Sequence, residues 1–214
     1  MLLINKPPGP TSHDIVDMVR KKTGVSRVGH TGTLDPFAQG LLIVLVGREE
    51  TKRQQEFLKL NKEYVATMRL GKESDTGDKM GAIQLTLQAD ATVLHEKTVR
   101  EALKKFTGTQ QQIPPAYSAI KVGGKKAYEL ARRGEDVRLS PREITVYELE
   151  LVEYAWPMLT IRARVSSGTY IRALAQDIGR ALGTGAYLEK LVRTQIGTYM
   201  LRDAKNIDDL QKGR

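Results

Sequence analysis

The chain has 214 residues, of which 40% are hydrophobic, and it contains no cysteine. This length allows one substantial core, and no apolar run approaches the roughly 18 residues of a membrane-spanning helix. The lack of cysteine excludes disulfides, thiolate nucleophiles and cysteine-ligated zinc. Because the first residues also lack the basic stretch and apolar core of a secretory signal, we expect a soluble, cytoplasmic protein.

The composition is basic, with 34 Lys and Arg against 25 Asp and Glu and a formal net charge of +9. The excess is spread along the chain rather than gathered in a tail, which favours a folded surface that grips a polyanion. Composition alone leaves the alternative open, because many basic soluble proteins bind nothing specific.

In the first half of the chain, helical and strand patterns alternate. A helix that Thr11 and Ser12 can cap is predicted to end near Gly24. Residues 41–46 form a continuous apolar run between glycines, which is typical of a buried strand. Two further strands and the polar turn between them are predicted at residues 64–70, 82–88 and 73–81.

The second half begins with a predicted capping box at Thr98 and Glu101, which would open a helix that runs to about Phe106 and stops at Gly108. Residues 142–166 are predicted to form two long strands, because apolar and polar residues alternate there.

Two helices and a last strand complete the predicted elements, at residues 170–182, 186–192 and 197–201. Gly183-Thr-Gly185 separates the two helices. No long linker or internal repeat interrupts the chain, so the pattern predicts one α+β domain with a mixed sheet.

The loop from Gly29 to Gly40 lies between the first helix and the buried strand and contains two reactive side chains, His30 and Asp35. Loops held by rigid elements often carry function. A structural reading competes, because an Asp before a Pro is a common turn former, and on local grounds this reading is favoured. A phosphate-binding loop is rejected, since His30 stands where the motif needs lysine.

Several motifs, in order along nearly the whole chain, resemble those of TruB-type tRNA pseudouridine synthases. They are Lys6-Pro-Pro-Gly-Pro-Thr-Ser12, Gly29-His-Thr-Gly-Thr-Leu-Asp-Pro-Phe-Ala-Gln-Gly40, Asn61-Lys-Glu-Tyr64, Ser74-Asp-Thr-Gly-Asp78, Ile113-Pro-Pro-Ala-Tyr-Ser-Ala-Ile-Lys121, Ser167-Gly-Thr-Tyr-Ile-Arg172 and Leu191-Val-Arg-Thr-Gln-Ile-Gly197. One motif alone would mean little, but the ordered set is specific.

The resemblance implies the pseudouridine synthase fold, in which a mixed, mostly antiparallel sheet is flanked by helices and loops. It implies that a uridine in the T loop of tRNA, at position 55, is isomerised to pseudouridine without a cofactor or a metal. It also implies roles for five residues, namely Asp35 as the catalytic carboxylate, Arg172 as its partner, Tyr64 as the aromatic that stacks on the target base, His30 as a residue that holds the flipped nucleotide, and Leu191 as an apolar lining of the pocket.

These residue types suit the reaction. Breaking a glycosidic bond without a metal calls for a carboxylate as nucleophile or charge stabiliser. A guanidinium beside Asp35 would lower the pKa of the carboxyl and orient it. A base inside a folded loop must first leave its stack, and an aromatic face such as that of Tyr64 compensates part of the cost. Without the family resemblance, the simplest interpretation of Tyr64 is an ordinary aromatic residue in a strand. Leu191 would be a core residue, and Arg172 would be a solvated residue on a helix.

Four lysines are expected to bind the substrate, namely Lys6, Lys121, Lys125 and Lys126. The last three fall in residues 113–137, where the resemblance places an RNA-gripping insertion; a solvated charged face is the alternative. Asp75 and Asp78 lie in a polar turn containing glycine and are read as turn formers outside the active site.

Two departures from the family pattern stand out. The chain is expected to be a single catalytic domain over residues 1–214, without the C-terminal PUA-like domain that is usual in the family. Residues 47–55 are also more charged than the family's usual segment, which could alter packing near the site.

We expect a monomer without an obligatory protein partner. The alternatives are a non-catalytic tRNA-binding or folding protein on the same scaffold and a guide-RNA-dependent, dyskerin-like synthase.

Overall fold

The computed structural model describes residues 1–86 and 94–210, which form two compact units. The first unit comprises Met1–Val65, Arg162–Ser167 and Lys190–Arg214, and the second comprises Ala66–Ile161 and Gly168–Glu189. Three strands have residues in both units, namely β4 (Lys62–Leu70), β11 (Met158–Val165) and β12 (Ala186–Ile196). None of the helices in the described ranges has the length and apolar character that crossing a membrane requires.

The first unit is built around β3 (Gln39–Val46), the apolar run predicted as a buried strand. β1 (Leu2–Lys6) and β2 (Val28–His30) both pair antiparallel with β3. β12 runs parallel to β3, with Arg193 opposite Gly40. The remaining elements are β13 (Tyr199–Met200), which pairs with β12, β14 (Lys205–Asn206), which pairs with β1, and the short helices α2 (Arg48–Lys52), α3 (Gln54–Leu58), η1 (Leu201–Asp203) and η2 (Ile207–Asp209).

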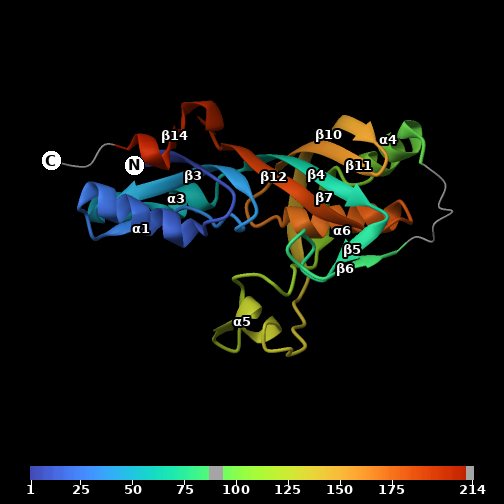
Figure 1. Cartoon of the computed structure of the whole chain (residues 1–214), viewed down its shortest axis with the longest axis horizontal. Helices are drawn as coiled ribbons and strands as arrows, with labels where there is room; N and C mark the ends of the chain where they lie inside the picture. The colour runs from blue at the N-terminus through green and yellow to red at the C-terminus, as the bar shows by residue number, and fades with distance from the viewer. Residues whose placement is uncertain (87–93, 211–214) are drawn as a thin grey trace. The chain divides into compact units, whose positions relative to one another are not determined.

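Alternate residues of β3 bury against different partners, which explains why its sequence is apolar throughout. Leu42 and Val44 belong to a cluster with residues of helix α1 (Ser12–Thr23), which runs along β3 (Figure 1). Leu41, Ile43 and Leu45 belong to a second cluster that contains Phe57 of α3 and Ile196 of β12. The strand therefore has a helix packed on each face.

The predicted boundaries of α1 are confirmed. Thr11 is the N-cap, and its side chain and that of Asp14 form a reciprocal capping box. Gly24 ends the helix in the left-handed conformation, with φ of 70° and its N–H bonded to the Arg20 carbonyl.

The second unit holds the two long strands predicted for residues 142–166, which are β10 (Arg142–Ala155) and β11. β10 pairs antiparallel with β7 (Gly108–Gln112), and the predicted strand at 64–70 is β4. The helices are α4 (Glu96–Lys104), α5 (Ala127–Ala131) and α6 (Ile171–Ala181), and two small hairpins are β5–β6 (Lys72–Ser74, Ile83–Leu85) and β8–β9 (Lys121–Val122, Lys125–Lys126). The mixed, mostly antiparallel α+β architecture is thus confirmed.

Two predictions of elements are wrong. Residues 186–192 belong to strand β12 and not to a helix. Tyr187, Leu188 and Leu191 recur at helical spacing, but pairing of β12 with β3 and β4 in the sheet overrides this local pattern. Helix α4 begins at Glu96 with His95 as its N-cap, so Thr98 lies inside the first turn and caps nothing. Of the strand predicted at 82–88, the described part forms β6 over Ile83–Leu85, and residues 87 and 88 lie outside the described ranges.

Candidate active site

Asp35 lies in the first unit, half-buried, in a turn whose backbone is fixed on both sides. The Ala38 N–H donates to the Asp35 carbonyl at 3.1 Å. The Ser12 hydroxyl both accepts from the Leu34 N–H at 2.8 Å and donates to the Leu34 carbonyl at 3.1 Å. Asp35 thus opens a turn through its backbone carbonyl, and this turn gives the carboxylate a rigid base. Binding of nearby N–H groups by the carboxylate itself stays a prediction.

Two buried cations hold this loop, Lys6 from β1 and Arg193 from β12. Lys6 is 0% exposed, and its ammonium donates to the carbonyls of Ala38, Pro7 and Pro36 at 2.7, 2.9 and 3.3 Å. Arg193 is 1% exposed and donates to the carbonyls of Leu41, Gly32 and Thr33 at 2.8, 3.1 and 3.5 Å. The backbone is thus held before and after Asp35.

The charge of Lys6 is linked to that of Asp35. Burial lowers the pKa of Lys6 to about 8, the negative charges of Asp35 and Asp14 oppose this shift, and the positive charge of Arg193 adds to it. Near pH 7 the ammonium is still mostly protonated and attracts the carboxylate. The contact with RNA expected for Lys6 stays a prediction.

Arg193 was missed by the sequence analysis, although it lies in one of the quoted motifs. Its place in a quoted motif was the available signal, since its neighbours Glu189, Lys190, Thr194 and Gln195 are polar and do not mark Arg193 as buried. Gly40 faces Arg193 in the β3–β12 register with φ of +110°, and a Cβ there would overlap the Arg193 backbone. Only glycine allows this close approach.

His30 ends strand β2 and is half-buried. Its Nδ1 accepts the Gly32 N–H at 3.3 Å, and its carbonyl accepts the Gln54 side-chain amide at 2.6 Å. Burial lowers the pKa of His30, and the charges of Arg193 and His13 lower it further. The imidazole is therefore neutral near pH 7.

Tyr64 and Leu191 are buried on β4 and β12, 8% and 6% exposed. Next to them in sequence, Glu63 accepts a hydrogen bond of 2.7 Å from the Thr194 hydroxyl, which links these two strands in the first unit. The roles expected for Tyr64 and Leu191 at the target base stay predictions.

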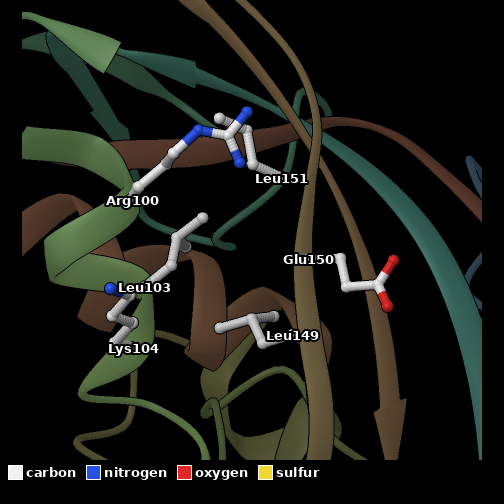
Figure 2. Close-up of a pocket in the computed structure, with 6 residues that line it drawn as sticks. All are labelled: Arg100, Leu103, Lys104, Leu149, Glu150 and Leu151. Atoms are coloured by element: carbon white, nitrogen blue, oxygen red, sulfur yellow. The ribbon is translucent and has the colours of Figure 1, made fainter. Parts of the chain in front are cut away.

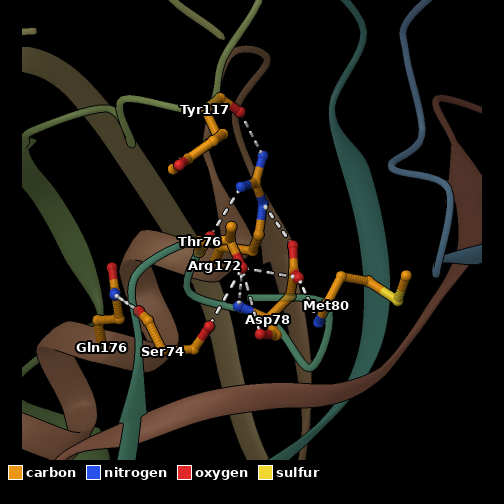
Figure 3. A network of polar contacts seen from close by, with 7 residues as sticks. All are labelled: Ser74, Thr76, Asp78, Met80, Tyr117, Arg172 and Gln176. Carbon is orange, nitrogen blue, oxygen red and sulfur yellow. Dashed lines mark hydrogen bonds and ion pairs between the residues drawn. The ribbon is translucent and has the colours of Figure 1, made fainter. Parts of the chain in front are cut away.

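Arg172 lies in the second unit, in the first turn of α6 as predicted, and is 5% exposed. Its guanidinium donates to the Thr76 and Tyr117 carbonyls at 2.8 and 2.9 Å, and its Nε lies 3.7 Å from Oδ2 of Asp78 (Figure 3). Asp35 belongs to the other unit, so the pairing expected between it and Arg172 stays a prediction.

Asp78 does more than the sequence analysis assigned to it. As expected of a turn former, its Oδ1 accepts the Thr76 hydroxyl and the Met80 N–H, both at 2.9 Å. The same carboxylate, 5% exposed, also faces Arg172. Asp75 accepts the Ala82 N–H at 2.8 Å, as a turn former does.

The three lysines expected to grip RNA meet in the β8–β9 hairpin. Lys121 lies opposite Lys126, Val122 lies opposite Lys125, and all three lysines are exposed. The hairpin lies within the predicted insertion, which also holds Tyr117, an acceptor of Arg172. The charged surface is thus present, and its binding of RNA stays a prediction.

A cavity of about 370 Å³ lies between α4 and β10 (Figure 2). Leu149 and Leu151 point toward α4, whereas the carboxylate of Glu150 points away. None of the predicted site residues lines this cavity. Over residues 1–86 and 94–210, no three His, Cys, Asp or Glu side chains form a group that could hold a metal.

The chain matches two family models. The model described as the N-terminal domain of TruB family pseudouridylate synthase matches residues 20–171, and that of the tRNA pseudouridylate synthase B C-terminal domain matches residues 172–213.

Among curated relatives, a protein named tRNA pseudouridine synthase B from Desulfotalea psychrophila is 47% identical over 95% of this chain and 84% of its own length. A protein of the same name from Parabacteroides distasonis is 46% identical over 98% of this chain and 92% of its own length.

Among solved structures, a chain in the crystal structure of a Cbf5–Nop10–Gar1 complex is 31% identical, with a TM-score of 0.76. A chain in an archaeal box H/ACA Nop10–Cbf5 complex is 29% identical, with a TM-score of 0.72. The match covers 98% of this chain in both cases but only 52% and 51% of those chains, so this chain spans about half their length.

Proposed function

The chain belongs to the TruB family of pseudouridylate synthases, and we propose that it isomerises the uridine at position 55 in the T loop of tRNA to pseudouridine. Uracil is detached from its ribose, rotated and rejoined through carbon. No cofactor is consumed, because all parts of the product come from the same nucleotide. The names of the relatives and the rigid setting of Asp35 support this function.

We propose Asp35 as the essential carboxylate. The observation that carries this assignment is the double anchorage of its loop, in which Lys6 and Arg193 bind backbone carbonyls on either side of the residue. A carboxylate that is fixed in advance loses little freedom on reaching the transition state. The buried positive charge of Lys6 favours its ionised form.

Arg172 and Tyr64 complete the proposed catalytic group. The hydrogen bonds from Arg172 to Thr76 and Tyr117 fix the plane of its guanidinium, as orientation of a carboxylate partner requires. Tyr64 would offer an aromatic face to the flipped uracil, and such stacking contributes about 1–3 kcal/mol per base. Leu191 would close the pocket on the detached base.

Substrate binding is assigned to two groups of residues. His30 would hold the flipped nucleotide, which must leave its stack before reaction. The exposed lysines of the β8–β9 hairpin, Lys121, Lys125 and Lys126, would contact T-arm phosphates and so position the RNA without reading its sequence.

An unmodified tRNA transcript tests the proposal. Wild type is expected to form pseudouridine at position 55, and Asp35→Asn is expected to form none at the same protein concentration. Asp17→Asn serves as the matched control, because Asp17 is a half-exposed carboxylate of the first unit that forms an ion pair with Arg20. If wild type forms no product, the proposed enzymatic activity is wrong, and the alternative of a non-catalytic tRNA-binding protein remains. If Asp35→Asn forms as much product as wild type, Asp35 is not the catalytic carboxylate.

The same assay tests the alternative that the chain is a guide-RNA-dependent synthase. This alternative is relevant because the chain is similar to chains of H/ACA complexes. We propose a monomer that acts in the cytoplasm without a protein partner. The purified chain should therefore modify tRNA in the absence of any other RNA or protein. A strict need for added guide RNA would favour the alternative.

A further inference from the structure

Within residues 1–86 and 94–210, strand β2 has a strand neighbour on one side only. Over the described part of the chain it pairs with β3, so the carbonyls on its other edge need other donors. Two side chains supply them at alternate residues. Arg20 donates to the Val28 carbonyl at 3.0 Å, and Gln54 donates to the His30 carbonyl at 2.6 Å. Side chains thus replace the missing strand at this edge.

Gln54 reaches His30 from a fixed position. It opens helix α3, and Phe57, on the same face one turn later, is 4% exposed within the cluster of Leu41, Ile43 and Leu45. The preceding helix α2 is tied to the start of β2, since the Arg27 Nε donates to the Thr51 hydroxyl at 3.0 Å. The charged segment 47–55, which departs from the family pattern, therefore packs on the strand that ends in His30.

The ring of His30 is fixed by a second contact. Since Nδ1 accepts the Gly32 N–H at 3.3 Å, a neutral ring carries its proton on Nε2. No residue in the described ranges forms a hydrogen bond with Nε2, which leaves that N–H as a donor for a ligand. The backbone bond from Gln54 and the ring bond from Gly32 together fix where this donor lies.

We propose that Gln54 is a positioning residue for tRNA modification, which holds His30 so that its Nε2–H is presented to the flipped nucleotide. This inference rests on the proposed function. Gln54 touches neither the RNA nor Asp35, and it acts through the His30 backbone. The substrate class is therefore a nucleotide that offers a hydrogen-bond acceptor to a neutral imidazole.

Gln54→Glu is the variant of choice, because it keeps the shape of the side chain but replaces the donating amide by a carboxylate. Gln55→Glu is the matched control, since it introduces the same charge at the exposed neighbouring position of the same helix. Gln54→Glu is expected to slow single-turnover pseudouridine formation roughly three- to tenfold, as loss of one hydrogen bond would. Gln55→Glu is expected to match wild type, and tRNA affinity is expected to stay within about twofold in both variants.

A double-mutant cycle with His30→Ala tests the route of the effect. Without the imidazole, Gln54→Glu should cause no further loss of rate. A loss of the same size in both backgrounds would overturn the proposal and assign Gln54 to general loop stability. An equal rate for Gln54→Glu and Gln55→Glu would also overturn it.

NMR provides a readout that does not depend on activity. Gln54→Glu should shift the His30 ring nitrogens and the Gly32 amide, and Gln55→Glu should leave both in place. The ring signals are assigned by comparison with His30→Ala among the three histidines of the chain. If wild type forms no pseudouridine, the proposed function fails, and unchanged NMR signals in Gln54→Glu would separately overturn the role of Gln54.

Discussion

The ammonium of Lys6 donates a hydrogen bond of 2.7 Å to the carbonyl of Ala38, just after Asp35 in the chain. A fully buried lysine that binds carbonyls instead of a carboxylate acts on the backbone. Its counterpart, Arg193, binds the backbone just before Asp35. The predicted catalytic carboxylate is thus carried by a loop that two buried cations hold in place.

We predict that Lys6→Met lowers pseudouridine formation at least tenfold. The variant fills the same space but removes the Lys6 donor from the Ala38 carbonyl, at a cost of about 1–3 kcal/mol in stability for a buried acceptor. The Pro36 carbonyl keeps its hydrogen bond of 2.8 Å from the Gly9 N–H. Single-turnover rates and urea unfolding of the same protein measure the two effects.

Lys62→Met is the control for this prediction. Lys62 is also buried, also has its pKa lowered to about 8 by burial, and donates to the carbonyls of Leu58 and Leu60, outside the Asp35 loop. Lys62→Met should lose about as much stability as Lys6→Met but retain more pseudouridine-forming activity. Equal rates in the two variants would mean that Lys6 contributes stability alone.

Stability and activity should respond oppositely to alkaline pH. Folding lowers the pKa of Lys6 from 10.5 to about 8, so between these values the unfolded chain binds more protons than the folded one. The contribution of Lys6 to the free energy of unfolding therefore rises with pH over this window, by at most about 1.4 kcal/mol per pH unit. Turnover should fall above pH 8, because Asp35 then loses a neighbouring positive charge.

Urea unfolding and single-turnover rates between pH 7 and 10 check this prediction. Lys6→Met should show a shallower rise of stability with pH than wild type. A parallel rise in both proteins would exclude Lys6 as its source.

Arg172→Lys should reduce turnover by about a hundredfold and change tRNA affinity little. A lysine cannot donate to the Thr76 and Tyr117 carbonyls and face Asp78 with one planar group. Asp78→Asn should cause a smaller loss, about tenfold, because only one neighbour of the guanidinium changes. Filter binding and single-turnover rates separate the two effects, and equal losses of affinity and turnover would make Arg172 a phosphate contact.

Lys125→Ala combined with Lys126→Ala should reduce the slope of log affinity for tRNA against log salt by about 1 to 2, as expected for two lost phosphate contacts. The matched control is Lys104→Ala with Lys105→Ala, which removes two exposed lysines at the end of α4. An unchanged slope in the hairpin variant would reject the RNA clamp, and the same change in both variants would indicate net charge alone.

The sequence by itself determined the elements whose signals are local. Thr11 and Gly24 delimit α1 because a cap and a left-handed glycine act within a single turn. The alternation from Leu159 to Val165 predicted β11, since one of its faces is buried. The ordered motifs identified the family and pointed to Asp35 as the catalytic carboxylate, because the whole set is specific where a single motif is not.

Only the tertiary structure decided the rest. The segment that begins at Ala186 is a strand because β12 pairs with β3 and β4 in the sheet, although its apolar residues Tyr187, Leu188 and Leu191 have helical spacing. From the sequence, Lys6 was expected to bind the substrate, and Arg193 and Gln54 were not singled out, yet each of the three reaches a backbone carbonyl far away in the sequence. The physical reason for this difference is that hydrophobic periodicity and helix caps are local properties of the chain. The hydrogen-bond partner of a buried cation or amide depends instead on how distant segments pack.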